Sequence, residues 1–140
     1  MFISRASRHD KSDIKALLDS HGWDDADLDR GVTFFAREGV VTGCVQLVEV
    51  APQRVVVDNV LVRKEHRGQG TGQRLMQTAM NSRGGTLYLC CHPELLDFYE
   101  RLGFSELPFE ALPEEAQAYF RAEGDWPTEE GHEHRFVSAR

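Results

Sequence analysis

The chain has 140 residues, of which 41% are hydrophobic and 28% charged, and its formal net charge is -7. A chain of this length buries roughly two-thirds of its unfolded surface, so we expect one domain over residues 1–140 that needs no disulfide or metal to hold its core. No apolar run approaches the roughly 18 residues that cross a bilayer, and the start lacks the apolar core of a secretion signal, which predicts a cytoplasmic protein without membrane contact. The acidic balance disfavours binding to nucleic acid.

Apolar residues recur along the chain with two different periods, which predict alternating strands and helices. Ile14, Leu17 and Leu18 follow the i, i+3, i+4 pattern of a helix, whereas residues 54–62 are rich in valine and leucine, as strands are. The expected strands are 3–6, 32–35, 43–50, 54–62, 86–91, a strand from 104, and 133–138. The expected helices are 13–20, 73–81, 93–102 and 112–122, with a short helix or turn at 24–28. This order predicts a mixed α/β sheet with helices on its faces.

Charge is unevenly distributed along the chain. Residues 63–74 carry four basic side chains and one acid beside a cluster of glycines, whereas residues 105–140 carry nine acids and three bases. The basic segment is the only part of the sequence suited to a polyanion. Either imbalance alone is typical of an ordinary solvated surface. The spacing of the glycines is therefore the observation that distinguishes a polyanion site from such a surface.

The segment Arg67-Gly-Gln-Gly-Thr-Gly72 lies between a predicted strand and a predicted helix. Three glycines in five residues let the backbone approach a ligand closely, and the helix N-terminus and Arg67 add donors, which predicts a phosphate or pyrophosphate site. A nucleoside-triphosphate P-loop would need Gly-Lys-Ser/Thr where Gly72-Gln73-Arg74 stands. The dinucleotide fingerprint needs a different glycine spacing and an acid about 20 residues on, so both alternatives are disfavoured.

The same segment carries a family resemblance. Val62-Arg-Lys-Glu-His-Arg67-Gly-Gln-Gly70-Thr-Gly72-Gln-Arg-Leu-Met76 resembles motif A of the GNAT superfamily of acyl-CoA-dependent N-acyltransferases, R/Q-x-x-G-x-G/A, with Arg67, Gly70 and Gly72 in its defined positions. Residues 57–62 are similar to the family's fourth strand, and residues 98–104 are similar to motif B. The resemblance covers residues 55–104 closely and the rest in element order only. It implies a mixed, mostly antiparallel central sheet that is splayed between strands 4 and 5 and flanked by helices.

The resemblance also implies acetyl-CoA as the acyl donor. Leu61 and Val62 would hold the pantetheine arm and the thioester through their backbone, and the glycine loop would hold the pyrophosphate. His92 stands where relatives commonly place an asparagine that bonds the pantetheine; it either keeps this contact or is a helix-capping or solvent-facing residue. The residues expected to bind the cofactor are Leu61, Val62, Arg67, Gly68, Gln69, Gly70, Thr71, Gly72, Gln73 and His92.

Two side chains are candidates for acid–base chemistry. Tyr99 lies in motif B, and a phenol with a reference pKa of about 10 can donate a proton to a leaving thiolate at neutral pH. Asp58 lies on the predicted fourth strand and is the expected base, although a carboxylate with a reference pKa of about 4 would need burial or a water chain to act so. Each has a structural alternative: a packed helix tyrosine for Tyr99, and a strand acid that bonds neighbouring backbone for Asp58.

Together these residues predict an N-acetyltransferase that moves an acetyl group from acetyl-CoA to a primary amine by direct attack. A small-molecule amine is the expected acceptor, and a protein lysine or N-terminus, or a non-catalytic acyl-CoA sensor, are the alternatives. The acidic C-terminal third favours a cationic acceptor. No metal is expected, because His132 and His134 lack a third ligand in the sequence pattern. Cys44, Cys90 and Cys91 are expected to be packed thiols, and the protein a monomer or a homodimer that pairs through an exposed last strand.

Overall fold

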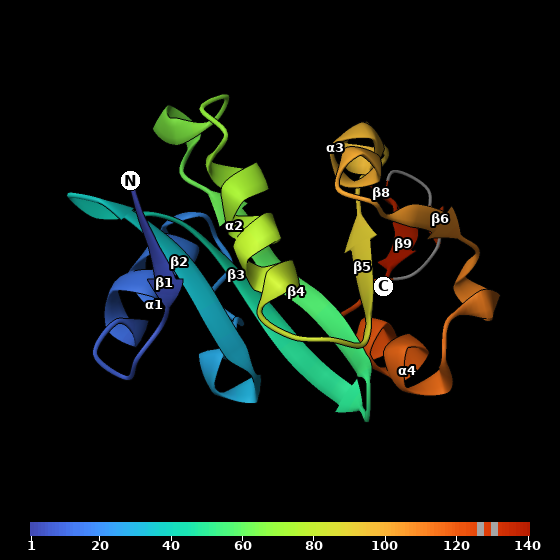
Figure 1. Ribbon diagram of the computed structural model, residues 1–140. Coiled ribbons are helices and arrows are strands. Elements are labelled where there is room, and N and C mark those ends of the chain that lie inside the picture. The colour runs from blue at the N-terminus through green and yellow to red at the C-terminus, as the bar shows by residue number, and fades with distance from the viewer. Residues whose placement is uncertain (126–127, 130–131) are drawn as a thin grey trace. The chain divides into compact units, whose positions relative to one another are not determined.

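A computed structural model describes residues 1–125, 128–129 and 132–140 (Figure 1). The strands are β1 (Phe2–Arg5), β2 (Val32–Glu38), β3 (Val40–Ala51), β4 (Arg54–Val62), β5 (Thr86–Cys91), β6 (Ser105–Leu107), β7 (Thr128–Glu129), β8 (His132–Glu133) and β9 (Arg135–Ala139). The α-helices are α1 (Lys11–Ser20), α2 (Thr71–Asn81), α3 (Leu96–Arg101) and α4 (Glu114–Ala122). None of the helices in these described ranges is long and apolar enough to cross a membrane.

Seven of these strands form one sheet in the order β1-β2-β3-β4-β5-β9-β6, and β7 pairs with β8 separately. The pairs β1–β2, β2–β3, β5–β9 and β6–β9 are antiparallel. The pair β4–β5 is parallel, with Arg54–Val56 opposite Thr86–Tyr88. The predicted mixed, mostly antiparallel α/β sheet flanked by helices is therefore confirmed, whereas the opening between strands 4 and 5 stays a prediction.

The chain forms two compact units. The first, here called the N-terminal unit, consists of Met1–Val48 and Asp58–Arg83. The second, the C-terminal unit, consists of Glu49–Val57 and Gly84–Arg140. The motif A residues and Asp58 belong to the first unit, and His92 and Tyr99 belong to the second.

Helices α1 and α2 cover opposite faces of β3 in the N-terminal unit. Cys44 on β3 is fully buried in a core cluster with Ile14, Leu17 and Leu18 of α1. The preceding residue, Gly43, faces Leu75 of α2 instead. Successive side chains of a strand point to opposite faces, so this alternation places one helix on each side.

The core of the C-terminal unit forms where α4 packs on β5 and β9. Phe120 of α4 is 2% exposed, and its ring lies 5.2 Å from the ring of Phe136 on β9. Phe109 adds a third ring, 5.1 Å from Phe136. Aromatic rings at these centroid distances contribute about 0.5–1.5 kcal/mol per pair beyond their burial. The apolar face of α4 thus holds the helix over the strands that carry the C-terminus.

The last strand corrects one expectation. The sequence suggests an exposed edge, but β9 lies between β5 and β6 and pairs with both (Figure 1). Val137 illustrates this placement, since it pairs with Leu89 on one side and Glu106 on the other. The last strand therefore cannot offer its edge to a second copy. Sequence periodicity reports which face of a strand is buried, but not which strands stand beside it.

Candidate functional site

The glycine loop joins β4 to α2 in the N-terminal unit. After a short 3₁₀ helix at Lys64–His66, Gly68 and Gly70 take φ values of 79° and 81°. An L side chain rarely adopts this left-handed region, and glycine does so at no steric cost. A Cβ at either position would meet nothing within 4 Å, so these glycines serve the backbone path and leave the surface above the loop open.

Helix α2 presents its N-terminus at the end of this loop. Arg74 N–H donates to the carbonyl of Gly70 at 3.0 Å, which is the first helical hydrogen bond. The N–H groups of Thr71, Gly72 and Gln73 precede this bond and have no acceptor within the helix. Gly70 caps the helix without a side chain, and the first turn holds no acid. The positive end of the helix dipole therefore lacks a carboxylate of its own, which suits a bound anion.

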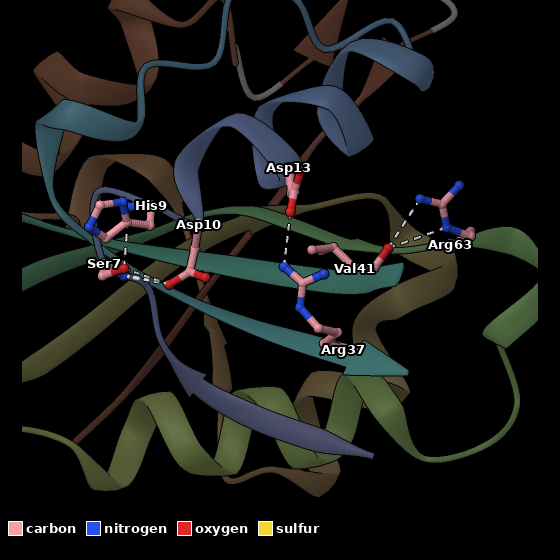
Figure 2. A network of polar contacts seen from close by, with 7 residues as sticks. All are labelled: Ser7, His9, Asp10, Asp13, Arg37, Val41 and Arg63. Carbon is pink, nitrogen blue, oxygen red and sulfur yellow. Dashed lines mark hydrogen bonds and ion pairs between the residues drawn. The ribbon is translucent and has the colours of Figure 1, made fainter. Parts of the chain in front are cut away.

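Two arginines fix the path of the chain before the loop. Arg63 donates from Nε and Nη2 to the carbonyl of Val41, at 3.3 and 3.1 Å (Figure 2). Arg67 donates from Nε to the carbonyl of Val62 at 3.0 Å, and its side chain is exposed. Guanidinium groups have five N–H donors, so Arg67 keeps donors for a ligand while it holds the loop against β4.

Backbone direction distinguishes the two β4 residues that the sequence assigns to thioester binding. Arg63 N–H donates to Thr42 of β3 at 2.7 Å. In a strand the backbone groups of successive residues point to opposite sides, so the N–H and carbonyl of Val62 point away from β3. The bond from Arg67 to the Val62 carbonyl agrees with this direction. Of Leu61 and Val62, only Val62 directs its N–H away from the neighbouring strand β3.

Gly43 on β3 sets how closely β4 and α2 approach. A Cβ there would lie 2.9 Å from Leu75 Cδ1 and 3.0 Å from the carbonyl oxygen of Leu61. Leu75 is fully buried and the oxygen is backbone, so neither moves aside easily. β4 and α2 can therefore lie this close to β3 only because residue 43 has no side chain.

We expect Gly43→Ala to lower the free energy of unfolding by about 1–3 kcal/mol, the usual cost of overpacking a core. Thermal and urea unfolding measure this. Gly84→Ala is the matched control, because Gly84 is exposed and its nearest neighbouring atom would lie 4.0 Å from the new Cβ. Equal stability of the two variants would contradict the proposed close packing.

Asp58 lies beside a strained residue in the middle of β4. Asn59 has φ 51°, and such a residue interrupts regular pairing and bends a strand. Its side chain donates to Gln46 Oε1 at 2.8 Å, and Gln46, which is fully buried, donates to the carbonyl of Asp27 at 2.8 Å. These two hydrogen bonds hold the side chain of Asn59 in place.

The Asp58 carboxylate has two partners in the same unit. Its Oδ1 accepts from the N–H of Asn59 at 2.7 Å, and its Oδ2 lies 3.5 Å from Arg30 Nη2. About a quarter of the side chain, 28%, is exposed. These contacts match the alternative that the sequence leaves open, a strand acid that bonds neighbouring backbone. The carboxylate is held in one orientation and still reaches solvent.

Tyr99 lies on α3 in the C-terminal unit and is 4% exposed. Its ring packs edge-on against Phe98 at 5.0 Å and Phe104 at 5.8 Å. Burial raises the pKa of the phenol above its usual value, and the nearby thiols of Cys91 and Cys90 raise it further. The phenol is therefore protonated throughout the neutral and mildly alkaline range.

The thiols and His92 occupy different environments. Burial raises the pKa of Cys44 to about 12 and that of Cys91 to about 11, so both are protonated packing groups at neutral pH. All three cysteines lie in the described part of the chain, and none forms a disulfide. His92 is exposed and precedes a 3₁₀ helix without a side-chain capping bond, so it is not the capping residue that the sequence allows.

Comparison with known proteins identifies the family. A family model described as an acetyltransferase (GNAT) domain matches residues 29–106, which is more than half of the chain. The chain belongs to the GNAT acetyltransferase family. The matched residues of this GNAT chain run from just before β2 through motif A to β6, which follows motif B. No protein with a curated description matches its sequence.

Several solved structures share the fold of this chain. The N-acetylglutamate synthase of Neisseria gonorrhoeae, solved with coenzyme A and N-acetyl-glutamate, is 18% identical with a TM-score of 0.73, over 100% of this chain and 35% of that one. The GNAT chain thus spans about a third of that protein's length. Escherichia coli ElaA is 14% identical (TM-score 0.71, 99% of each chain). Mycobacterium tuberculosis Rv2747, solved with CoA, is 18% identical (TM-score 0.69, 99% of this chain and 98% of that one).

The sequence-based reasoning missed the polar network beneath Asp58. Neither Gln46 nor Asn59 was assigned a role from the sequence. The one available signal was Asn59 itself, because asparagine is enriched among non-glycine residues with positive φ. Its partner Gln46, 13 residues away, could not be found without the register of β3 and β4.

Proposed function

We propose that the protein is an N-acetyltransferase that transfers the acetyl group of acetyl-CoA to a primary amine of a small molecule, by direct attack in a ternary complex. The observation that carries this proposal is the left-handed Gly68–Gly70 loop ending in the uncapped N-terminus of α2. Coenzyme A has a pyrophosphate, and this arrangement of backbone N–H groups suits such an anion. Neighbours of the same fold were solved with coenzyme A, which supports the assignment.

The residues of motif A would bind the donor in three contacts. The N–H groups from Gly68 to Gly72 would hold the pyrophosphate, with Gln69 and Thr71 in the loop and Gln73 at its edge. Exposed Arg67, Lys64 and Arg74 would offset its charge. The Val62 N–H would donate to the thioester carbonyl oxygen, where negative charge develops as the amine attacks. Leu61 would line the same segment of β4, and His92 would contact the pantetheine.

The acid–base roles go to Tyr99 and Asp58. As the amine nitrogen bonds to the acetyl carbon, the carbon–sulfur bond breaks and Tyr99 Oη donates its proton to the departing thiolate. The attacking nitrogen carries two protons and a positive charge, and the surplus proton leaves to Asp58, directly or through a water, so that a neutral amide remains. Asp58 is held by Arg30 and Asn59, so it would also orient the acceptor amine.

The acceptor is assigned on charge. The acidic segment 105–140 would favour a cationic amine, as the sequence suggests. Three of its acids are already engaged, however, since Glu115 pairs with Arg54 and both Glu106 and Glu133 pair with Arg135. The charge left to attract an acceptor is therefore smaller than the sequence count indicates. A protein lysine or N-terminus remains the second candidate acceptor.

We expect acetyl-CoA to bind in calorimetry, with affinity that falls as salt rises because phosphate contacts are screened. Release of free thiol with a panel of small amines, a lysine peptide and anionic amino acids then identifies the acceptor. Thiol release with at least one small amine confirms the proposal. Binding without thiol release on any acceptor would favour the non-catalytic sensor, and no binding at all would refute both.

A further inference from the structure

Three metal-binding side chains converge in the C-terminal unit, from positions far apart in the sequence. They are Cys90 at the end of β5, Asp125 after α4 and His134 before β9. The Cys90 thiol, an Asp125 carboxylate oxygen and an imidazole nitrogen of His134 all lie within 4.8 Å of one another, and each residue is half-buried. None of the three is used in the acetyl transfer proposed above.

The framework of this unit holds the three residues together. Cys90 pairs with Phe136 across β5 and β9, which brings His134, two residues earlier, to the end of β5. The ring contact between Phe120 and Phe136 seats α4 over the same strands. Asp125 N–H then donates to the Phe120 carbonyl at 2.8 Å and closes the turn after α4. The positions of the three residues are therefore determined by strand pairing and helix packing.

The chemistry of the donors selects the kind of ion. A thiolate and an imidazole are ligands that Zn²⁺ and similar transition metals prefer, whereas Ca²⁺ and Mg²⁺ need several oxygen ligands. Zinc–ligand bonds of about 2.0–2.3 Å place tetrahedral ligand atoms roughly 3.5 Å apart. Side-chain rotations that move each ligand atom by about 1 Å would therefore complete the site. His92 supplies a further imidazole, since its ring lies 5.6 Å from the ring of His134 and is exposed.

We propose that Cys90, Asp125 and His134 form a binding site for a zinc-type divalent transition metal ion, with one ring nitrogen of His92 as the fourth ligand. The other ring nitrogen of His92 is then left for the pantetheine contact proposed above. The ion would join the end of α4 to β5 and β9 as a structural clip. This proposal replaces the expectation of no metal, which rested on the lack of a third ligand beside His132 and His134 in the sequence. The side chain of His132 lies outside the described residues. The missing ligands come from positions 90 and 125, which sequence spacing could not connect.

The adjacent thiol provides an internal control. Cys91 points to the opposite side of β5 from Cys90 and is 6% exposed. Cys91→Ser should therefore leave metal affinity unchanged. His9, an exposed histidine of the N-terminal unit, gives a second control as His9→Gln.

The test is a zinc titration of the tag-free full chain, stripped with a chelator and followed with a chromophoric competitor. We expect one equivalent to bind, with affinity reduced at least 10-fold in Cys90→Ser, His134→Gln, Asp125→Asn and His92→Gln, and unchanged in the two controls. Co²⁺ should give a thiolate charge-transfer band in the wild type that is lost in Cys90→Ser. Zinc should also raise the melting temperature of the wild type but not of His134→Gln.

Several results would overturn the proposal. They are no stoichiometric binding by the wild type, unchanged affinity in Cys90→Ser and His134→Gln, or a Co²⁺ spectrum without a thiolate band. Should Cys90→Ser fail to fold, Asp125→Asn and His134→Gln decide, because both change half-buried residues outside the packed core. Unchanged affinity in His92→Gln would overturn the fourth-ligand assignment. Acetyl-CoA binding is measured separately, so failure of the metal site is distinguishable from failure of the proposed function.

Discussion

Gly70→Asp is expected to weaken the binding of acetyl-CoA by about 10²–10³-fold. The new carboxylate would stand at the N-terminus of α2, where the pyrophosphate is proposed to bind. Two like charges about 4 Å apart repel by about 4 kcal/mol at an effective dielectric constant near 20. The same carboxylate would compensate the helix dipole that now favours an anion. Calorimetry with acetyl-CoA and with coenzyme A measures the loss.

Two control variants separate charge from backbone strain in this experiment. Gly70→Asn has nearly the same shape without the charge, so its loss of affinity should be much smaller than that of Gly70→Asp. Gly22 follows α1 in the same unit with φ 77°, and its Cβ would also meet nothing within 4 Å. Gly22→Asp should therefore cost similar strain and leave binding unchanged. Equal affinity of Gly70→Asp and the wild type would discredit the loop as the pyrophosphate site.

The glycine loop shows why part of the site could be predicted from sequence. Local sequence patterns determine local structure. Glycine readily adopts the positive φ that the backbone has at Gly68 and Gly70. The apolar periodicity of 73–81 predicts the start of α2 to within two residues. Motif A lies within one strand–loop–helix segment. Its residues are therefore brought together by the local chain path alone.

Non-local contacts could not be predicted in the same way. The bond between Asn59 and Gln46 requires the pairing of two strands, and the insertion of β9 between β5 and β6 requires the whole sheet order. The cluster of Cys90, Asp125 and His134 requires both strand pairing and the packing of α4. Each depends on tertiary contacts, which hydrophobic periodicity does not encode.

Charge counts need the same correction. The acids of 105–140 suggest an attractive surface, but Arg135 lies between Glu106 and Glu133 at 2.8 Å from each. Ion pairs of this kind reduce the field that a distant ligand meets. Arg63 and Arg67 differ from Arg135, because they bond to backbone carbonyls and not to carboxylates.

Tyr99→Phe is expected to lower the turnover number by about 10²–10³-fold and to leave the affinity for acetyl-CoA unchanged. General acid catalysis typically contributes about 10²–10⁴-fold, and the substitution removes only the hydroxyl group. The ring contacts with Phe98 and Phe104 remain, so the fold should be retained. Steady-state kinetics on an accepted amine, together with calorimetry for the donor, separates the two effects.

The raised pKa of Tyr99 gives the same variant a second signature. In the unfolded chain the phenol ionises near pH 10, whereas burial keeps it protonated in the folded protein at that pH. Its contribution to the free energy of unfolding is therefore fully present below about pH 10 and is lost as the pH rises further. Tyr99→Phe lacks this ionisation, so its unfolding free energy should fall less steeply in alkaline urea titrations.

Tyr119→Phe is the control for the turnover measurement, because Tyr119 is a half-buried tyrosine on α4. It should keep wild-type turnover. A Tyr99→Phe enzyme with undiminished turnover across the pH range would remove Tyr99 as the proton donor. If the alkaline slope still differed from that of the wild type, Tyr99 would be a buried tyrosine that only packs α3 against Phe104.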